Sequence, residues 1–311
     1  MSTVKILICD SIHPEGIEKL KEAGFSIDFL VRRESLKKDI REYDALIVRS
    51  RTKVTREIIE HGKRLKLIAR AGSGIDNIDL KAAEERGVTV INTPEAPADS
   101  VAELTIGLMI ALARRITLAD SSMKQERWLK KELKGLQLRG KKLGLIGLGN
   151  IGLRVARIAK AMGMKILVNK RSPPPPELLK SLEAEFLPLD ELLRRSDIVS
   201  IHVPLTEETR RIIGAEEIKK MKDGAFLINT SRGGVVDEEA LLNALRSGKL
   251  GGAALDVYEV EPPKNWEIIK LPNVICTPHI GAQTAEAQRK ASVTLADEMI
   301  RFFEQFQSSS P

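Results

Sequence analysis

The chain has 311 residues, enough for about two domains of ordinary size. Hydrophobic residues make up 42% of it and charged residues 30%, which allows a sizeable buried core and excludes an intrinsically disordered chain. The formal net charge of +7 is compatible with a nucleic-acid partner or with the lysine-rich surface of an enzyme. The basic residues are scattered and no nucleic-acid-binding motif accompanies them, so the enzyme surface is favoured and no nucleic-acid partner is expected.

Three further features bear on where the protein resides. No run of about 18 uncharged apolar residues occurs, so no membrane span is expected. The N-terminal stretch MSTVKILICD enters an apolar strand pattern directly and lacks the basic region and cleavage site of a signal peptide. The two cysteines, Cys9 and Cys276, lie inside apolar runs, as expected for reduced thiols. Together these features predict a cytoplasmic protein with no membrane partner.

From the N-terminus, short apolar runs alternate with helix-like segments. The stretches VKILICD, HPEGIEKLKEAG and FSIDFL form a strand–helix–strand pattern, and DALIVRS, TREIIEHGKR and LKLIARAG repeat it. The run GVTVINTP closes this first part of the chain. Strands that alternate with helices predict parallel pairing and an α/β fold.

A long helix is expected next, over residues 99–122, with Asp99 or Ser100 as its N-cap. Its apolar residues cover nearly every face, which indicates burial and favours contact with another subunit. A second α/β unit follows, with strands in KKLGLI, KILVNK, DIVSIHVPL, GAFLINTSRGG, GGAALDVY and NVICTPHIGA. We therefore expect two doubly wound parallel-sheet domains, Rossmann-like or flavodoxin-like, with a cleft between them.

Gly147, Gly149 and Gly152 form a G-x-G-x-x-G turn between an expected strand and an expected helix, which is the context that a dinucleotide-binding turn requires. The first glycine allows a tight turn, the second lets the backbone approach a pyrophosphate, and the third lets the helix pack on the strand. The alternative is a structural turn that binds nothing.

In a dinucleotide-binding unit, an acidic residue about 20 positions further on accepts hydrogen bonds from the adenosine ribose. This chain has Asn169 or Lys170 there, in the stretch KILVNKRSPPPP. Lys170, Arg171 and Ser172 suit a ribose 2′-phosphate instead, because bases form charge-assisted hydrogen bonds with phosphate. The alternative is a solvated loop beside the prolines. The sequence leaves NAD and NADP open and favours the use of both.

Four more motifs follow in order: SIHVPL (200–205), NTSRGGVVDE (229–238), LDVYEVEPP (255–263) and TPHIGA (277–282). With the glycine turn, they make the chain resemble the D-isomer-specific 2-hydroxyacid dehydrogenases over nearly its whole length. Three stretches resemble the phosphoglycerate dehydrogenase branch in particular: VRSRTKVT (48–55), RAGSGIDNID (70–79) and HIGAQTAEAQ (279–288). The resemblance implies a dinucleotide-binding domain over residues 99–284 and a substrate-binding domain made of residues 1–98 and 285–311.

The resemblance also implies a catalytic set of Arg232, Glu261 and His279. An imidazole titrates near neutrality, so His279 can accept a hydroxyl proton as hydride leaves the same carbon. Glu261 would orient the ring and stabilise its charged form, while Arg232 offers a planar fork to the substrate carboxylate or carbonyl. Taken singly, they could be a structural histidine, a solvated acid and a loop base; the shared order of the motifs favours the catalytic set. His202 is expected to line the cofactor site rather than to act in catalysis.

By the same resemblance, further residues are expected to face the cofactor: Asn150, Ile151, Pro204, Thr230, Ser231, Asp256, Gly281 and Ala282. The loop Ala71, Gly72, Ser73 and Gly74 is expected to offer backbone N–H groups to a substrate carboxylate. Arg49 and Ser50 are expected to reach a substrate phosphate. No metal ligand is expected.

The implied reaction is hydride transfer between NAD or NADP and a D-2-hydroxy acid. Oxidation of D-3-phosphoglycerate to 3-phosphohydroxypyruvate, which opens serine synthesis, is the favoured case. A glyoxylate or hydroxypyruvate reductase is the alternative with the same chemistry, and an NAD-sensing co-repressor is the alternative of a different class. A homodimer formed through the helix at 99–122 is also expected.

Overall fold

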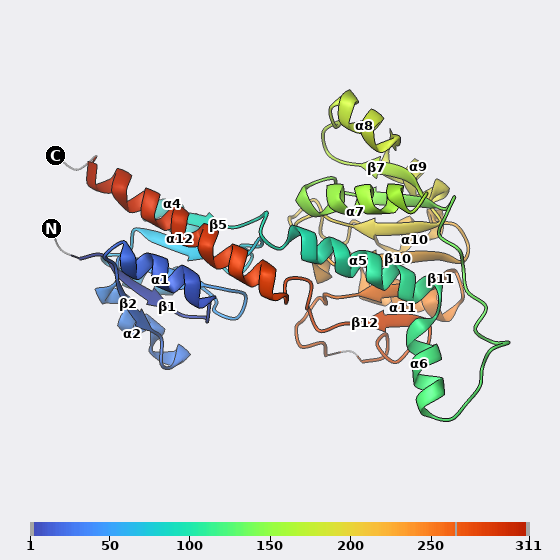
Figure 1. The fold of residues 1–311 in the computed structure, drawn as a ribbon, viewed down its shortest axis with the longest axis horizontal. Helices are drawn as coiled ribbons and strands as arrows, with labels where there is room; N and C mark the ends of the chain where they lie inside the picture. The colour runs from blue at the N-terminus through green and yellow to red at the C-terminus, as the bar shows by residue number, and fades with distance from the viewer. Residues whose placement is uncertain (1–2, 265, 309–311) are drawn as a thin grey trace. The chain divides into compact units, whose positions relative to one another are not determined.

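The computed structural model describes residues 3–264 and 266–308, which divide into two compact units. Unit 1 comprises Met1–Ala98 and Ala282–Pro311, and unit 2 comprises Asp99–Gly281. Each unit is a parallel sheet covered by helices, which confirms the predicted fold class (Figure 1). The predicted substrate-binding domain includes residues 1–2 and 309–311, which lie outside the described residues.

Unit 1 is built on a five-stranded sheet of order β2-β1-β3-β4-β5, in which every neighbouring pair is parallel. Its strands are β1 (Lys5–Ile8), β2 (Ser26–Phe29), β3 (Ala45–Val48), β4 (Leu67–Arg70) and β5 (Thr89–Asn92). Its helices are α1 (Pro14–Glu22), η1 (Arg33–Ser35), α2 (Leu36–Asp39), η2 (Ile40–Glu42), α3 (Arg56–His61), α4 (Leu80–Glu85) and α12 (Ala285–Ser308).

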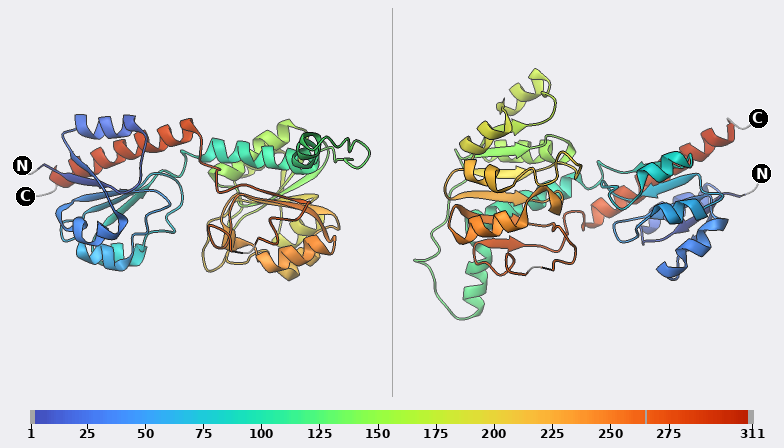
Figure 2. Two further views of the ribbon diagram at one scale, coloured as in Figure 1. Left: turned by 90° about the horizontal axis from the view of Figure 1, so that it is seen from below. Right: turned by 180° about the vertical axis from the view of Figure 1, so that it is seen from behind.

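Helices cover both faces of this sheet. α1 and α12 lie on one face, and α2, α3 and α4 lie on the other (Figure 2). Strand β1 shows how one strand serves two cores: Ile6 and Ile8 pack in the cluster that includes α12, whereas Leu7 packs in the opposite cluster. Successive side chains of a strand point to opposite faces, so a strand buried on both sides is apolar throughout.

Unit 2 contains a seven-stranded parallel sheet of order β12-β11-β10-β9-β6-β7-β8. Its strands are β6 (Lys142–Ile146), β7 (Lys165–Asn169), β8 (Ala184–Phe186), β9 (Ile198–Ile201), β10 (Ala225–Asn229), β11 (Leu250–Leu255) and β12 (Val274–Cys276). Its helices are α5 (Ala98–Ala113), α6 (Ile116–Lys124), α7 (Asn150–Ala161), α8 (Pro176–Leu182), α9 (Leu189–Arg195), α10 (Ala215–Lys220), η3 (Gly233–Val235) and α11 (Glu238–Arg246).

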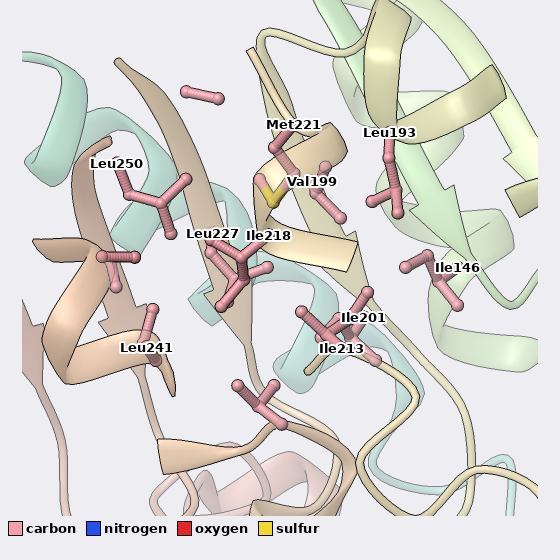
Figure 3. Close-up of a cluster of buried hydrophobic side chains, with 14 of the residues drawn as sticks. Ile146, Leu193, Val199, Ile201, Ile213, Ile218, Met221, Leu227, Leu241 and Leu250 are labelled. Carbon is pink, nitrogen blue, oxygen red and sulfur yellow. The ribbon is translucent and has the colours of Figure 1, made fainter. Parts of the chain in front are cut away.

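Two hydrophobic clusters hold unit 2 together, one on each face of the sheet. α5 and α7 contribute to the first cluster, and α9, α10 and α11 contribute to the second. Figure 3 shows the second cluster, in which Leu193 of α9, Ile218 of α10 and Leu241 of α11 meet the strand residues Val199 and Leu227. The helices packed on both faces hold the sheet in place, and the loops of the candidate site follow its strands.

The strand order reverses once in each sheet, between β1 and β3 in unit 1 and between β6 and β9 in unit 2. Ligands of open α/β sheets bind outside the carboxyl ends of the strands at such a reversal. In unit 2 the glycine turn follows β6 and His202 follows β9. In unit 1 Asp10 lies just beyond β1, and Arg49 directly follows β3.

The single helix predicted over residues 99–122 is wrong in one respect, because the structure has two helices there, α5 and α6. Arg115 adopts a left-handed conformation with φ of 52°, which interrupts the helix. The apolar pattern of the sequence continues through Arg115, so the pattern does not reveal the break between the two helices. Most apolar residues of α5 are buried within unit 2, and the exposed ones lie later, at Ile116, Met123 and Trp128. None of the described helices is both long and apolar enough to cross a membrane.

Candidate active site

The glycine turn between β6 and α7 has the geometry of a phosphate cradle. Gly147 has φ of 98°, and a Cβ there would lie 2.3 Å from the carbonyl oxygen of His202. A Cβ on Gly152 would lie 2.3 Å from the carbonyl oxygen of Gly147. By contrast, a Cβ on Gly149 would enter open space above the start of α7. The positive end of a 12-residue helix dipole faces this space, which therefore fits the phosphates of a dinucleotide. Asn150 and Ile151 form the first turn of the helix.

The carboxyl end of β7 carries exposed positive charge. The side-chain amide of Asn169 donates to the Leu187 carbonyl at 2.9 Å, which ties the end of β7 to the residue after β8. Lys170, Arg171 and Ser172 follow it and are exposed. A guanidinium nitrogen of Arg171 lies 3.6 Å from Oε2 of Glu208, a residue that sequence reasoning missed because no motif surrounds it.

His202, at the end of β9, is held in its neutral form. Burial lowers its pKa to about 4. Its Nε2 atom lies 2.9 Å from Oγ of Ser200, and its buried Nδ1 atom has no hydrogen-bond partner among the described residues. A side chain that stays neutral and has no carboxylate partner is unsuited to general acid–base work near neutral pH. Pro204, further along the same loop, is exposed.

The loop after β10 is shaped by buried hydrogen bonds. The Oδ1 atom of Asn229 accepts from both the N–H and the hydroxyl of Ser231, at 3.1 and 2.8 Å. The Asn229 amide also donates to the Arg232 carbonyl at 2.8 Å. The Thr230 hydroxyl lies 2.8 Å from that of Thr105 on α5. These bonds fix the backbone that carries Arg232, and sequence reasoning had singled out neither Asn229 nor Thr105.

Glu261 and His279 form the acid–base pair of the site. The Nδ1 atom of His279 lies 2.7 Å from Oε2 of Glu261. Burial raises the pKa of Glu261, but the hydrogen bond from His279 and the positive charge of nearby Arg232 bring the pKa below its usual value. Glu261 is therefore a carboxylate, which only accepts, so Nδ1 of His279 carries the proton of this bond. The other ring nitrogen, Nε2, is left to exchange a proton with a ligand.

The backbone at His279 is strained, with φ of 53° at a residue that is not glycine. Such a conformation costs on the order of 1–3 kcal/mol and persists only where neighbouring contacts hold it. Asp256, which is 1% exposed, supplies those contacts. Its Oδ1 accepts from the Thr277 hydroxyl at 2.6 Å and from the Ile280 N–H at 2.8 Å, and its Oδ2 accepts from the Gly281 N–H at 2.9 Å. Asp256 was expected to face the cofactor; here both its carboxylate oxygens anchor the loop on either side of His279.

In unit 1, the loop that follows β3 is fixed around Asp10. The Oδ2 atom of this buried carboxylate accepts from the N–H groups of Arg49 and Thr52 at 2.8 and 3.1 Å. Its Oδ1 atom lies 3.6 Å from a guanidinium nitrogen of Arg33 and 3.8 Å from one of Arg51. Ser50 is exposed on the same loop. Sequence reasoning had found Arg49 and Ser50 but missed Asp10, Arg33 and Arg51, which are distant in sequence or lie outside the strand end.

Two of the four expected substrate-binding N–H groups in the loop after β4 already have acceptors. The N–H of Ala71 donates to the Val48 carbonyl at 3.0 Å, and that of Gly72 donates to the Thr93 hydroxyl at 2.8 Å. Within the described part of the chain, the N–H groups of Ser73 and Gly74 have no acceptor, so these two remain for an anionic ligand.

Comparison with known proteins agrees with this arrangement. The family described as D-isomer specific 2-hydroxyacid dehydrogenase, NAD binding domain, matches residues 106–281. A hydroxypyruvate reductase of Thermotoga maritima is 53% identical over 97% of this chain and 99% of its own length. A D-3-phosphoglycerate dehydrogenase of Methanocaldococcus jannaschii is 48% identical over 95% of this chain, but the chain spans only 57% of that relative.

Solved structures share the whole fold. The TT0316 protein of Thermus thermophilus superposes with a TM-score of 0.89 at 35% sequence identity, over 97% of both chains. The glycine turn, the paired Glu261 and His279, and these matches over nearly the full length lead to one conclusion. The chain belongs to the D-isomer specific 2-hydroxyacid dehydrogenase family.

Proposed function

We propose that this oxidoreductase interconverts a D-2-hydroxy acid and the corresponding 2-oxo acid, with His279 as the general base. The observation that carries the proposal is the 2.7 Å hydrogen bond between His279 and Glu261. Because Nδ1 is committed to Glu261, Nε2 of His279 accepts the hydroxyl proton in oxidation and returns it in reduction. Glu261 stabilises the imidazolium that forms, as a nearby opposite charge does. Arg232 binds the substrate carboxylate through its planar guanidinium.

The cofactor would be held by the cradle at Gly149 and the N-terminus of α7, on the geometry described above. The nicotinamide ring supplies the hydride chemistry, and the protein supplies position and electrostatics. Thr230, Ser231 and Gly281 contribute backbone to the loops near the acid–base pair, and contact of these residues and Ala282 with the cofactor remains a prediction.

The use of both NAD and NADP is proposed from the end of β7. An acidic residue there would bind the ribose diol and repel a 2′-phosphate, but this chain has Asn169 followed by Lys170 and Arg171. Lys170 and Arg171 can bind the 2′-phosphate by charge-assisted hydrogen bonds. Glu208 competes for Arg171 at 3.6 Å, which favours dual use over strict NADP specificity.

D-3-phosphoglycerate is the proposed substrate because of the arginines of unit 1. Guanidinium nitrogens of Arg33 and Arg51 lie 3.6 and 3.8 Å from the buried carboxylate of Asp10, and Arg49 donates its backbone N–H to the same carboxylate. Arg49 is half-buried, and its pKa is lowered by burial, which outweighs the opposing effect of Asp10. Three guanidiniums with one carboxylate leave an excess of positive charge that a phosphate would neutralise.

Reduction of hydroxypyruvate or glyoxylate is the second candidate. It is supported by the 53% identity to the hydroxypyruvate reductase, whose length this chain spans almost completely. 3-Phosphohydroxypyruvate and hydroxypyruvate differ only by the phosphate, so their kcat/KM values with NADH and NADPH separate the two candidates. A clear preference for the phosphorylated acid supports the first, and equal or reversed values support the second. No turnover of either acid with either cofactor would contradict both.

We also propose a homodimer. Among the described residues, Ile116, Met123 and Trp128 are apolar and exposed, with 47%, 56% and 75% of their surface accessible, and they lie within thirteen positions of each other. Large apolar side chains that stay exposed on one short segment favour a subunit contact, and a two-fold dimer is the commonest arrangement.

A further inference from the structure

Tyr258 contacts two of the loops that carry the proposed catalytic residues. Its backbone N–H donates to Oε1 of Glu261 at 3.2 Å, so Glu261 uses one oxygen for His279 and the other for Tyr258. Its hydroxyl donates to the carbonyl oxygen of Thr277 at 2.9 Å, with the Leu255 carbonyl at 3.3 Å as a second acceptor. The side chain is buried at 7% exposure, so these bonds are shielded from water.

The third loop, which carries Arg232, packs directly against the same residue. A Cβ on Gly233 would lie 1.9 Å from the carbonyl carbon of Tyr258 and 2.3 Å from the nitrogen of Glu259. Only glycine allows this approach, so the backbone after Arg232 lies against the Tyr258–Glu259 peptide. Tyr258 is thus joined to the loops of Arg232, Glu261 and His279.

We propose that the hydroxyl of Tyr258 is a positioning group that sets the geometry of the Glu261–His279 pair. This inference rests on the proposed function, because it assigns to Tyr258 a role that acts only through those two residues. Tyr258 lies inside the motif LDVYEVEPP, but the catalytic set that the resemblance implies consists of Arg232, Glu261 and His279 and gives Tyr258 no role.

The physical reason lies in the chain between Thr277 and His279. The Thr277 carbonyl belongs to the peptide bond that precedes Pro278, and the proline ring fixes φ of Pro278 near −65°. A hydrogen bond that orients this peptide plane therefore also restricts the position of the Pro278 carbonyl carbon, which is bonded to the nitrogen of His279. Asp256 holds the other side of His279 through Ile280 and Gly281. Tyr258 and Asp256 both hold Thr277 before the strained residue, and Asp256 also holds the two residues after it.

The ring and the hydroxyl of Tyr258 have separable roles. The ring belongs to one of the two hydrophobic clusters of unit 2, which also contains residues of β10 and β11. Tyr258→Phe keeps this ring and removes only the hydroxyl. The matched control is Tyr43→Phe, because Tyr43 is the only other tyrosine in the sequence and its hydroxyl donates to Asp28 in unit 1.

The test compares the steady-state kinetics of Tyr258→Phe, Tyr43→Phe and the unchanged enzyme. Tyr258→Phe should lower kcat by about 3- to 10-fold, the scale of one neutral hydrogen bond, with KM and the cofactor Kd unchanged. Tyr43→Phe should leave all three constants unchanged. The proposal would be overturned if Tyr258→Phe raised KM or weakened cofactor binding and left kcat unchanged. Full activity of Tyr258→Phe would overturn it as well.

A double-mutant cycle shows whether the hydroxyl acts through His279. In a His279→Ala background, Tyr258→Phe should have no further effect on the residual rate, because groups that act as a unit are not additive. An equal further loss in that background would assign the hydroxyl a general structural role and reject the proposal, as would failure of Tyr258→Phe to fold. If His279→Ala alone were fully active, the proposed function itself would fail; if His279→Ala is inactive and Tyr258→Phe is fully active, only the positioning role fails.

Discussion

The Nδ1 atom of His279 and the Oε2 atom of Glu261 are 2.7 Å apart, although 18 positions separate the two residues in the sequence. The hydrogen bond fixes the tautomer of the imidazole, with the proton on Nδ1 and Nε2 as the acceptor nitrogen. Glu261 has its pKa below the usual value, so it remains ionised at neutral pH and supports a positive ring. The carboxylate therefore supports both the neutral and the protonated form of the His279 ring, which differ by one proton on Nε2.

His279→Ala should lose roughly 100-fold or more in kcat, which is the ordinary contribution of a positioned general base. Cofactor affinity, measured by titration of reduced nicotinamide fluorescence, should be unchanged. His61→Ala is the control, since His61 lies on α3 of unit 1, where its Nδ1 lies 2.7 Å from the Glu57 carbonyl. Full activity of His279→Ala would contradict the assignment of the base.

Lys170→Asp should restore discrimination against NADP. A carboxylate next to a 2′-phosphate costs about 1.4 kcal/mol or more, which is about a tenfold change in the ratio of kcat/KM for NADP and NAD. Lys180→Asp, the same change at an exposed position of α8, should leave the ratio unaltered. A strong preference for NAD in the unchanged enzyme that Lys170→Asp does not alter would show that the bases after β7 do not bind the cofactor.

Arg49→Ala should reduce kcat/KM for 3-phosphohydroxypyruvate more than for hydroxypyruvate. A hydrogen bond to a charged group contributes about 1.5–3 kcal/mol, so the ratio should fall by about 10- to 150-fold. Arg64→Ala is the matched control, since Arg64 pairs with Asp44 in the same unit. Equal losses on both acids would mean that Arg49 does not recognise phosphate.

His202 should make stability depend on pH in the absence of ligands. Its folded-state pKa of about 4 lies below the ordinary value of 6.5, so the unfolded chain binds more protons between these values. The contribution of neutral His202 to the free energy of unfolding is complete above pH 6.5. It is lost as the pH falls toward 4, and the free energy of unfolding then changes by at most about 1.4 kcal/mol per pH unit. Thermal unfolding midpoints at both ends of this window should differ less in His202→Gln than in the unchanged protein. An identical pH dependence in His202→Gln would disprove this assignment, and His61→Gln serves as the control.

Light scattering at micromolar concentration should report a dimer, and Met123→Glu combined with Trp128→Glu should shift it toward monomer. Charges introduced into a buried apolar contact are costly because they lose water without gaining partners. Phe29→Glu, at an apolar residue of unit 1 that is 54% exposed, is the control and should leave the mass unchanged. A monomer in the unchanged protein would reject the proposed dimer.

The sequence alone determined the parallel α/β architecture and the place of the glycine turn, because both depend on residues that are close together in the sequence. Alternating apolar runs and helical segments predict parallel sheets, and three glycines between a strand and a helix predict a tight turn with room for a phosphate. The order of the motifs also identified the family. The break between α5 and α6 was missed, since the apolar periodicity passes through Arg115 without a glycine or proline to mark it. The three-residue strand β8 was missed as well, because so short a run has no distinct period.

Only the tertiary structure decided which side chains support the site. Asp256 lies 24 positions from Ile280 and Asp10 lies 39 positions from Arg49, so no local spacing signals that each carboxylate anchors the other residue's backbone. The same holds for Tyr258 and Thr277, which are 19 positions apart. These hydrogen bonds form because the sheet brings the strand ends together, and this proximity depends on the order of strands in the sheet rather than on their order in the chain. The sequence therefore names the candidate groups of the site, and the packing of neighbouring strand ends determines how they are held.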